Sequence, residues 1–599
     1  MLKLFKLSKS LWWQLLLVFF FVAIQTILQL LLPNYTETIT QSLAQGNAVD
    51  NSLILMTGLK MLGVSFLILL AAMAQMVTNA SLMASFGKII RSKLFKKVQD
   101  YSVSNINTIG TSSLLTRINS DTRMLQTFMF MLTRTVIMAP TFMIIGTIML
   151  FQTNPMYTYI ILIGIPVILV VISITFKYAA PLFKLVQERL DYVTLLFREG
   201  LTGVRVVRAF NQEKREYKFF NKANRDMADT NIKVGRIMEF VNPLITIIFN
   251  VAYVSVFIVG LIIFEESANP NNDTVLSQVI KSGQIVNMIM MSFLMLSFIF
   301  IMFPRSSASA KRIVEALELE PEIKDSTKMS PNQLTDGVGS VEFKNVLFTY
   351  SDNLHPTLSN ISFKTKPGEV TAIIGSTGSG KSSVINLLPR FFDVTEGEVL
   401  INNINVKDYN LADLRKNIGF VPQQAVLFSG TVRDNLRFGN KDATDEDMIE
   451  ALQVAQAWGF IKDKEGLDTI VAQGAKNFSG GQKQRLSIAR ALVRKPNVYV
   501  FDDSFSALDF KTDIKLRRAL SEYAKKSSII IVAQRVSSII NAHQIVVLDE
   551  GKIAGIGKHN DLLRTCSVYQ EIVKSQMDKD EIEKTVLLQQ EVVTMKGGN

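Results

Sequence analysis

The chain has 599 residues and a formal net charge of +12, with 48% hydrophobic and only 19% charged residues. This balance excludes a disordered chain and is too apolar for a purely soluble protein of this length. Its single cysteine, Cys566, excludes an intrachain disulfide and a cysteine-cluster metal site, and three scattered histidines argue against a zinc site.

Six long apolar runs fill the first half of the chain and then stop. Each reaches the length of roughly 20 residues that a helix needs to cross the hydrocarbon core of a bilayer. One such run is often a buried helix of a soluble protein, but six in succession predict a membrane domain. The first run follows Lys3, Lys6 and Lys9 but is too long for a cleaved signal peptide, so we take it as a span with Trp12 and Trp13 at the inner interface. The predicted spans cover residues 11–32, 52–78, 126–151, 157–176, 237–264 and 279–303.

The distribution of Lys and Arg predicts how these spans are oriented. Connection 83–125 holds seven of them and connection 177–236 holds thirteen, whereas segments 33–51, 152–156 and 265–280 hold none. The positive-inside rule therefore places the N-terminus, both long connections and the C-terminal half in the cytoplasm of a multi-pass cell-membrane protein. Because this assigns much of the surplus charge to the inner membrane face, nucleic acid is not an expected partner.

The two cytoplasmic connections have helical patterns. Residues 83–101 and 182–197 repeat apolar residues at helical spacing. We therefore predict that spans 2 to 5 continue as helices into the cytoplasm and meet in short turns near 102–112 and 210–217. The predicted domains are a six-helix membrane domain at 1–310, a charged linker at 311–340, an α/β domain at 341–575 and a charged tail at 576–599, which we expect to be a loosely held helix.

A phosphate-binding pattern follows an early strand of the second half, where β-rich runs alternate with helical patterns. Directly after the run 369–374, the chain reads G-x-x-x-x-G-K-S, whose glycines let backbone N–H groups wrap phosphates. Lys381 is placed to reach the terminal phosphates, and Ser382 offers a hydroxyl to Mg²⁺. The strand–loop–helix context makes this a specific prediction of a nucleotide site. The loop consists of Gly375, Ser376, Thr377, Gly378, Ser379, Gly380, Lys381 and Ser382.

A second strand supplies a candidate metal ligand. The run 498–501 ends in Asp502, a carboxylate suited to holding Mg²⁺ through water. Many strands end in Asp, so this residue gains meaning only because it shares a domain with the phosphate loop.

Between these two motifs the chain reads Phe478-Ser479-Gly480-Gly481-Gln482-Lys483-Gln484-Arg485. This octet resembles the signature of an ATP-binding cassette. With six spans ahead of one such domain, nearly all of residues 10–575 resembles a half-transporter of the ABC exporter family. The resemblance implies that each ATP lies between the phosphate loop of one chain and Ser479, Gly480, Gly481 and Gln482 of another, so that the protein works as a dimer.

The same resemblance implies roles for further residues. Tyr350 corresponds to the aromatic residue that stacks on adenine, and Gln423 to the glutamine that senses Mg²⁺ and contacts the membrane domain. Segment 506–509 corresponds to the loop that crosses between paired cassettes. The cytoplasmic turns correspond to coupling helices near 105–111 and 211–216, through which ATP binding and hydrolysis move the membrane helices.

Three positions depart from the pattern of that family. Asp503 follows Asp502 where the family usually carries the catalytic Glu, Gln534 stands at the switch position in place of His, and Gln473 replaces an acidic residue before the signature. General bases are worth roughly 10²–10⁴-fold, so a base displaced by about 1 Å should slow hydrolysis severely while ATP and Mg²⁺ still bind. We therefore predict the degenerate-site subunit of a heterodimeric multidrug exporter, whose homologous partner subunit carries most of the hydrolysis. The alternative is a homodimer in which Asp works adequately as the base.

Few residues in the sequence indicate which substrate the protein carries. Lys60 and Lys281 lie within or beside spans near the outer face, where a charge is either functional or snorkels to the interface. The sixth span is rich in adaptable side chains, about half of which should face lipid or other helices. We expect export of hydrophobic or amphipathic compounds from a lipid environment; the alternatives are a lipid or peptide exporter and an ATP-gated channel or regulatory subunit. The side chains in question are Met288, Met290, Met291, Phe293, Met295, Phe298, Phe300 and Met302.

Overall fold

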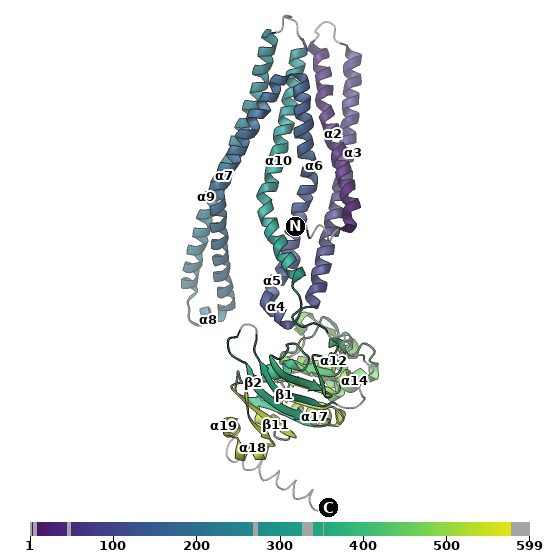
Figure 1. The fold of residues 1–599 in the computed structure, drawn as a ribbon, viewed down its shortest axis with the longest axis vertical. Helices are drawn as coiled ribbons and strands as arrows, with labels where there is room; N and C mark the ends of the chain where they lie inside the picture. Colours follow the sequence, from purple (N-terminus) through teal and green to yellow (C-terminus); the bar gives the residue numbers. More distant parts are fainter. Residues whose placement is uncertain are drawn as a thin grey trace, which may run out of the picture. The chain divides into compact units, whose positions relative to one another are not determined.

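The computed structural model describes residues 3, 9–44, 50–266, 273–325, 339–350 and 353–576 (Figure 1). The chain divides into two compact units, one formed by Met1–Gln99 with Thr111–Leu319 and the other by Asp100–Gly110 with Glu320–Asn599. The helix predicted beyond residue 576 lies outside the described residues.

The first unit is a bundle of long helices. Among the described residues, six helices are long and apolar enough to cross a membrane, which confirms the six predicted spans. The helices α3, α7 and α9 have 49, 48 and 54 residues, so at about 1.5 Å per residue each exceeds twice the roughly 30 Å of a bilayer core. The helix of span 3 runs over Thr111–Thr153, which is 43 residues, so the predicted continuation of spans 2 to 5 as helices is confirmed. The elements of this unit are η1 (Lys9–Leu11), α2 (Trp12–Ala44), α3 (Asn51–Gln99), α5 (Thr111–Thr116), η3 (Arg117–Asp121), α6 (Thr122–Thr153), α7 (Pro155–Thr202), α8 (Val204–Ala209), α9 (Glu213–Glu266) and α10 (Asp273–Glu318).

The second cytoplasmic turn lies earlier than its predicted position. The break between α7 and α9 runs from Gly203 to Gln212 and contains the short helix α8, whereas residues 213–216 already form the first turn of α9. Gly203 leaves the helical conformation with φ −87° and ψ 8°, and Asn211 turns the chain with a φ of 52°. A lone glycine inside a helical pattern is often tolerated, which is why the sequence placed the turn at 210–217.

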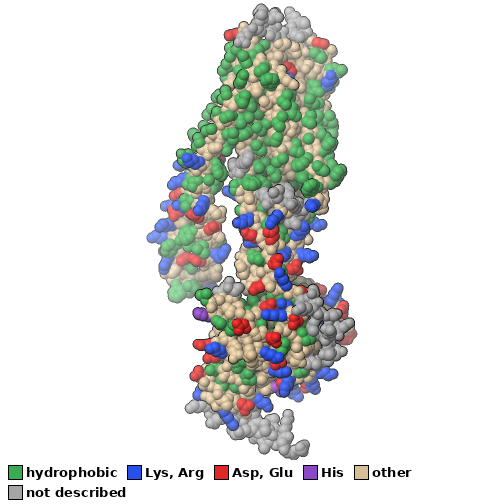
Figure 2. Space-filling view, in the orientation of Figure 1, with side chains coloured by type: hydrophobic (Ala, Val, Ile, Leu, Met, Phe, Trp, Pro, Cys, Tyr) green, Lys and Arg blue, Asp and Glu red, His purple; other side chains and the backbone are tan. Residues whose placement is uncertain are grey.

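The outer surface of the helices matches a membrane environment along one part of their length. Figure 2 shows hydrophobic side chains covering the upper part of the bundle, while Lys and Arg gather lower on the same helices. Leu62 on α3 and Ile163 on α7 are 68% and 67% exposed. Such side chains are stable only against lipid or another chain. The separation of apolar and basic surface agrees with the topology expected from the positive-inside rule.

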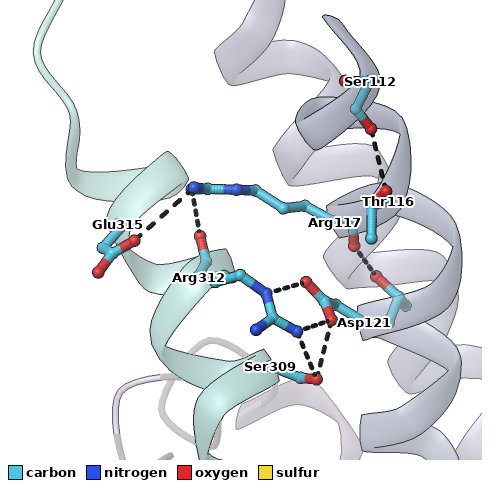
Figure 3. Close-up of polar contacts among 8 residues, drawn as sticks. Ser112, Thr116, Arg117, Asp121, Ser309, Arg312 and Glu315 are labelled. Atoms are coloured by element: carbon cyan, nitrogen blue, oxygen red, sulfur yellow. Dashed lines mark hydrogen bonds and ion pairs between the residues drawn. The ribbon is translucent and has the colours of Figure 1, made fainter. Parts of the chain in front are cut away.

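An ionic network joins α10 to the start of α6 (Figure 3). The Asp121 carboxylate accepts hydrogen bonds from Arg312 Nε at 2.8 Å and Ser309 Oγ at 2.8 Å, and it also contacts Arg312 Nη2. Arg117 pairs with Glu315 at 3.7 Å and donates to the main-chain oxygen of Arg312 at 2.6 Å. Residues 311–318, which the sequence assigned to the linker, form the last turns of α10, and the charges of Arg312 and Glu315 are paired with residues of η3.

The second unit is an α/β domain with two main sheets, as the alternating pattern predicted. One sheet is antiparallel with strand order β2-β1-β4-β5, and the other has the order β12-β11-β3-β10-β9-β6; a small third sheet pairs β7 with β8. The strands are β1 (Val341–Phe348), β2 (Leu358–Thr365), β3 (Val370–Gly375), β4 (Glu396–Ile401), β5 (Ile404–Asn405), β6 (Ile418–Val421), β7 (Gly430–Thr431), β8 (Ile470–Val471), β9 (Val498–Asp502), β10 (Ser528–Val532), β11 (Gln544–Asp549) and β12 (Lys552–Gly557).

Helices and short 3₁₀ segments surround these sheets. Strands β9 and β10 are buried at every position, which explains why their sequences are continuous apolar runs rather than alternating ones. The helical segments of the second unit are α4 (Val103–Ile109), α11 (Lys381–Leu387), α12 (Leu411–Lys416), α13 (Val432–Arg437), α14 (Asp445–Val454), α15 (Trp458–Lys462), η5 (Gly466–Asp468), η6 (Gln473–Ala475), α16 (Gly480–Val493), α17 (Phe510–Tyr523), η7 (Val536–Ser538), α18 (His559–Thr565) and α19 (Ser567–Gln576).

The short helix α4, which lies between α3 and α5 in sequence, belongs to the second unit. Ser102 caps it through a capping box with Asn105, and both residues are buried. The Asn105 side chain also donates to the main-chain oxygen of Glu320 at 3.4 Å and accepts from the backbone N–H of Glu322 at 3.1 Å. In the first predicted coupling segment, 105–111, residues 105–109 are thus helical in α4 and are held to the segment that enters the cassette.

Candidate nucleotide-binding site

Parallel strands bring the predicted site residues to one edge of the six-stranded sheet. The neighbouring strands β11, β3, β10, β9 and β6 all run parallel. The carboxyl ends of parallel strands meet at one edge, where open α/β sheets bind ligands. The phosphate loop follows β3, Asp502 ends β9, and Gln534 and Gln423 each lie two residues beyond the ends of β10 and β6.

The phosphate loop has a conformation that requires its glycines. Gly378 and Gly380 have φ values of 86° and 94°, in the region that glycine adopts without steric cost. A Cβ atom on Gly375 would lie 2.2 Å from the main-chain oxygen of Leu548 and 2.5 Å from Ser379 Oγ. The sequence pattern therefore reflects both a left-handed turn and the close packing of the loop on β11.

Lys381 begins α11 and lies folded over the loop. Its Nζ donates to the main-chain oxygens of Gly375 at 2.9 Å and Ser376 at 2.6 Å. Burial lowers the pKa of Lys381, while the carboxylates of Asp503 and Asp502 act in the opposite direction. A partly buried ammonium beside flexible main-chain acceptors is well placed to exchange these contacts for phosphate oxygens.

Two side-chain oxygens that could bind a metal ion, those of Ser382 and Asp502, lie next to Lys381. Ser382 Oγ donates to Asp502 Oδ1 at 3.4 Å. Burial raises the pKa of Asp502, the hydrogen bond from Ser382 lowers it, and the neighbouring charge of Asp503 raises it further. Burial disfavours the ionised form of this carboxylate, and a bound cation would stabilise that form. Mg²⁺ is usually bound by one or two protein oxygens together with phosphate oxygens. The pair fits Mg²⁺, which would neutralise phosphate charge when bound. In the described part of the chain, no cluster of three or more His, Cys, Asp or Glu is arranged to hold a metal.

Asp503 occupies the position of the predicted base, and hydrogen bonds fix its main chain. Burial raises the pKa of Asp503, and the nearby side chains of Ser506 and Gln423 act in the opposite direction. Ser506 Oγ donates to the main-chain oxygen of Asp503 at 2.9 Å. The backbone N–H of Asp503 donates to the main-chain oxygen of Val532 at 3.0 Å, and its φ of 46° is left-handed. The main chain of Asp503 is therefore held by neighbours in the same chain, in a backbone conformation that Asp tolerates better than most residues.

The switch residue Gln534 has an exposed side chain, and its main chain is held by a residue that the sequence analysis missed. Gln576 Nε2 donates to the main-chain oxygen of Gln534 at 2.8 Å, and Gln576 Oε1 accepts from the backbone N–H of Val536 at 2.9 Å. Gln576 is the last residue of α19, so the helix extends one residue beyond the predicted boundary at 575. Nothing in its local sequence distinguishes it from the charged tail that follows.

Tyr350 lies near the site with its ring supported on two sides. Its ring packs edge-on against Phe348 and Phe392, with centroid distances of 4.7 and 5.1 Å, and its hydroxyl is 3.0 Å from Ser383 Oγ. Ser383 directly follows the phosphate loop on α11. A stacking role on adenine stays a prediction.

The signature lies on a separate helix from the phosphate loop. Ser479 caps α16: its Oγ accepts from the backbone N–H of Gln482 at 3.3 Å, and its own N–H donates to Gln482 Oε1 at 2.9 Å. Space around Gly480 is open, and a Cβ on Gly481 would lie 3.0 Å from the main-chain oxygen of Ala507. Within the described residues, these four positions make no hydrogen bond to the phosphate loop. The single chain therefore assembles the phosphate loop, Asp502, Asp503 and Gln423 but presents its signature elsewhere.

Comparison with known proteins places this geometry in a family. The family model described as "ABC transporter transmembrane region" matches residues 15–287, and the model described as "ABC transporter" matches residues 358–506. An uncharacterized ABC transporter ATP-binding protein of Mycobacterium tuberculosis is 37% identical over 559 residues, covering 92% of this chain and 94% of its own length. This chain belongs to the ABC transporter family. Its six membrane helices and one cassette make it an ABC exporter half-transporter with an ATP-binding domain in the cytoplasm.

Other relatives of this half-transporter carry more specific names. An ATP-dependent lipid A-core flippase of Haemophilus influenzae is 32% identical over 518 residues, covering 85% of this chain and 86% of the flippase. The solved structure of a bacterial Atm1-family ABC exporter with ATP bound matches with a TM-score of 0.80 and 22% identity, over 95% of this chain and 100% of that chain. At this identity the likeness shows the fold, and the fold agrees with the one expected from the sequence.

Proposed function

We propose that this half-transporter is one subunit of a heterodimeric exporter of hydrophobic or amphipathic compounds, of the multidrug type, whose own site binds ATP and hydrolyses it slowly. The observation that carries the proposal is the pair of residues beside the nucleotide site. Asp503 and Gln534 stand where ABC exporters usually carry Glu and His, while the phosphate loop, Lys381 and Asp502 are intact.

The geometry of Asp503 supports slow hydrolysis. Its side chain is one methylene shorter than that of Glu, and Ser506 Oγ holds the main-chain oxygen of Asp503 at 2.9 Å. Its backbone is held by a hydrogen bond to β10, so the chain cannot shift readily to compensate. Gln534 adds to the effect because an amide can hydrogen-bond a phosphate but cannot carry a proton.

The signature supports a partner. Ser479, Gly480, Gly481 and Gln482 retain the family pattern, and the backbone around Gly480 is open. In a head-to-tail pair these residues would complete the nucleotide site of a homologous half-transporter, where most hydrolysis would occur. ATP and Mg²⁺ would then serve binding at this chain's own site, with Lys381 on the phosphates and Ser382, Asp502 and Gln423 around the metal.

The alternatives to multidrug export are lipid export, peptide export, and an ATP-gated channel or regulatory subunit. A lipid exporter is favoured by the similarity to lipid A-core flippases, and a peptide exporter would use the same cassettes. An ATP-gated channel or regulatory subunit would open without pumping.

On α10, Met290 and Phe293 are buried within the bundle, whereas Met291 and Phe298 are 53% and 64% exposed. The exposed pair is compatible with contacts to an apolar cargo.

A ranking of two variants tests the division of labour. In the co-purified heterodimer, Lys381→Met disables the site that is already slow and should leave most ATP turnover. Ser479→Ala disables the partner's site and should remove most of it. The opposite ranking would refute the assignment, as would brisk ATP turnover by this chain purified without a partner.

A repair experiment tests the cause. Asp503→Glu combined with Gln534→His restores the usual base and switch, and should raise hydrolysis at this site by roughly 10²-fold or more. The matched control is Asp503→Asn with Gln534→His, which restores only the switch and should give no such gain. Turnover should be measured in a heterodimer whose other site is silenced by Ser479→Ala. An unchanged rate in the repaired protein would show that the two residues do not limit hydrolysis.

A further inference from the structure

An ion pair lies inside the membrane bundle near its outer end. Lys281 Nζ of α10 is 2.9 Å from Glu37 Oε2 of α2, and the two side chains are 14% and 26% exposed. A snorkelling lysine would keep its ammonium exposed, as Lys60 does on α3. Glu37 lies just beyond the predicted first span and Lys281 near the start of the sixth, so the largely buried pair is at the level of the outer headgroups, where it can meet a polar ligand.

The pair lines a cavity of about 460 Å³ between α2, α6 and α10. This volume is within the range of sites that bind ligands of drug size. The half-buried side chains of Asn34 and Gln278 face this cavity, and neither forms a hydrogen bond with any other described residue. A salt bridge that only tied two helices together would need neither the cavity nor these uncommitted amides. The lining consists of Ile27, Leu30, Leu31, Asn34, Glu37, Ile145, Met149, Gln152, Thr153, Gln278 and Lys281.

The lining changes from apolar to polar along the membrane normal. On α2 the apolar positions 27, 30 and 31 come before the polar positions 34 and 37, and on α6 positions 145 and 149 come before 152 and 153. Both helices run outward in the topology that places the cassette in the cytoplasm. The apolar floor is therefore deeper in the bilayer and the charged pair is at the outer end, separated on α2 by about 15 Å at 1.5 Å per residue. An amphiphile in the outer leaflet has the same order of apolar chain and polar head.

We propose that this cavity binds a zwitterionic amphiphile whose head carries an anionic group and an ammonium group. The anion pairs with Lys281, the ammonium pairs with Glu37, and Asn34 and Gln278 supply neutral hydrogen bonds. A head with a single charge would separate the ion pair and leave one partly buried partner unmatched, so the site discriminates against it. This inference rests on the proposed export of amphipathic compounds and names their chemical class.

Binding of defined lysolipids tests the site. The full-length chain is placed in nanodiscs that contain only phosphatidylglycerol, and lysophosphatidylethanolamine is titrated as the zwitterionic probe, with lysophosphatidylglycerol as the anionic one. We expect saturable binding of the zwitterion at one site per chain, at least tenfold tighter than binding of the anion. Absence of saturable binding, or equal affinity for both probes, would overturn the proposal.

Two variants separate a ligand site from a structural ion pair. Gln278→Leu keeps the ion pair but removes an amide that has no protein partner, so it should weaken zwitterion binding at least tenfold only if the cavity is a ligand site. Asn34→Leu is a second variant of the same kind. Lys60→Gln removes an exposed lysine of the same membrane level as a control and should change binding less than twofold. Binding unchanged in both amide variants would show that the pair only joins α2 to α10.

ATP measurements on the same preparations distinguish this proposal from the proposed function. If lysolipid binding fails while the ranking of the nucleotide-site variants holds, only the ligand assignment is wrong. Stimulation of ATP turnover by the zwitterion identifies it as cargo, and binding without stimulation identifies a resident lipid; both outcomes support the site.

Discussion

The network around Asp121 makes a quantitative prediction about how α10 is held. The Asp121 side chain is 4% exposed and accepts hydrogen bonds from Arg312 and Ser309, so it joins the last turns of α10 to the start of α6. Asp121→Asn keeps the shape of the side chain but removes its charge. The Arg312 guanidinium then loses its counter-ion.

The magnitude follows from the exposure of the two partners. Removing one member of a fully buried pair costs about 3–5 kcal/mol, and an exposed pair is worth about 1 kcal/mol or less. Asp121 is buried but the Arg312 side chain is 45% exposed and can regain water. We therefore expect a local loss of about 1.5–3 kcal/mol, intermediate between these limits.

Hydrogen exchange measures this loss where it occurs. Because 1.4 kcal/mol corresponds to a factor of ten, amides of residues 309–318 should exchange about 10- to 150-fold faster in Asp121→Asn. The control is Glu315→Gln, which removes the longer and more exposed pair with Arg117 and should accelerate exchange by less than about fivefold. Equal, small effects of the two substitutions would refute the reasoning, since the buried carboxylate would then hold nothing that the exposed one does not.

Three further outcomes are expected in the cassette. Gln576→Ala should accelerate hydrogen exchange of the Val536 amide by about fivefold to tenfold, because a hydrogen bond is worth about 1 kcal/mol. Unchanged exchange would show that the hydrogen bond from the Val536 N–H to Gln576 is not formed in solution. His559 is buried and hydrogen-bonded to Tyr569 at 2.7 Å, and burial lowers the pKa of His559. The unfolded chain therefore binds more protons as the pH falls through about 6.5, so cassette stability should decline there, and His559→Gln should flatten the decline in denaturant midpoint. Gly375→Ala would place a Cβ atom 2.2 Å from a carbonyl of β11, and ATP affinity measured by equilibrium binding should fall more than tenfold; retained affinity would mean that the loop can move away.

Much of this protein was determined by sequence alone. The six spans, their cytoplasmic extensions, the α/β domain and the phosphate loop all follow from local patterns: apolar length, Lys and Arg bias, and glycines at fixed spacing. The strand that ends in Asp502 lies where its apolar run predicted. These features are local because each depends on a few neighbouring residues and on the solvent around them.

The tertiary structure decided what depends on contacts between distant segments. Residues 311–318 look like a charged linker, yet they are helical because Arg312 pairs with Asp121 from another helix. The sequence around Gln576 resembles the charged tail that follows, but in the fold α19 brings this side chain to the main chain of Gln534 and Val536. The sequence allows Lys281 either a functional role or a snorkelling side chain, and the fold decides between them by placing Glu37 beside its ammonium group. A charged or amide side chain costs or contributes energy according to its partner, and its partner is chosen by the fold.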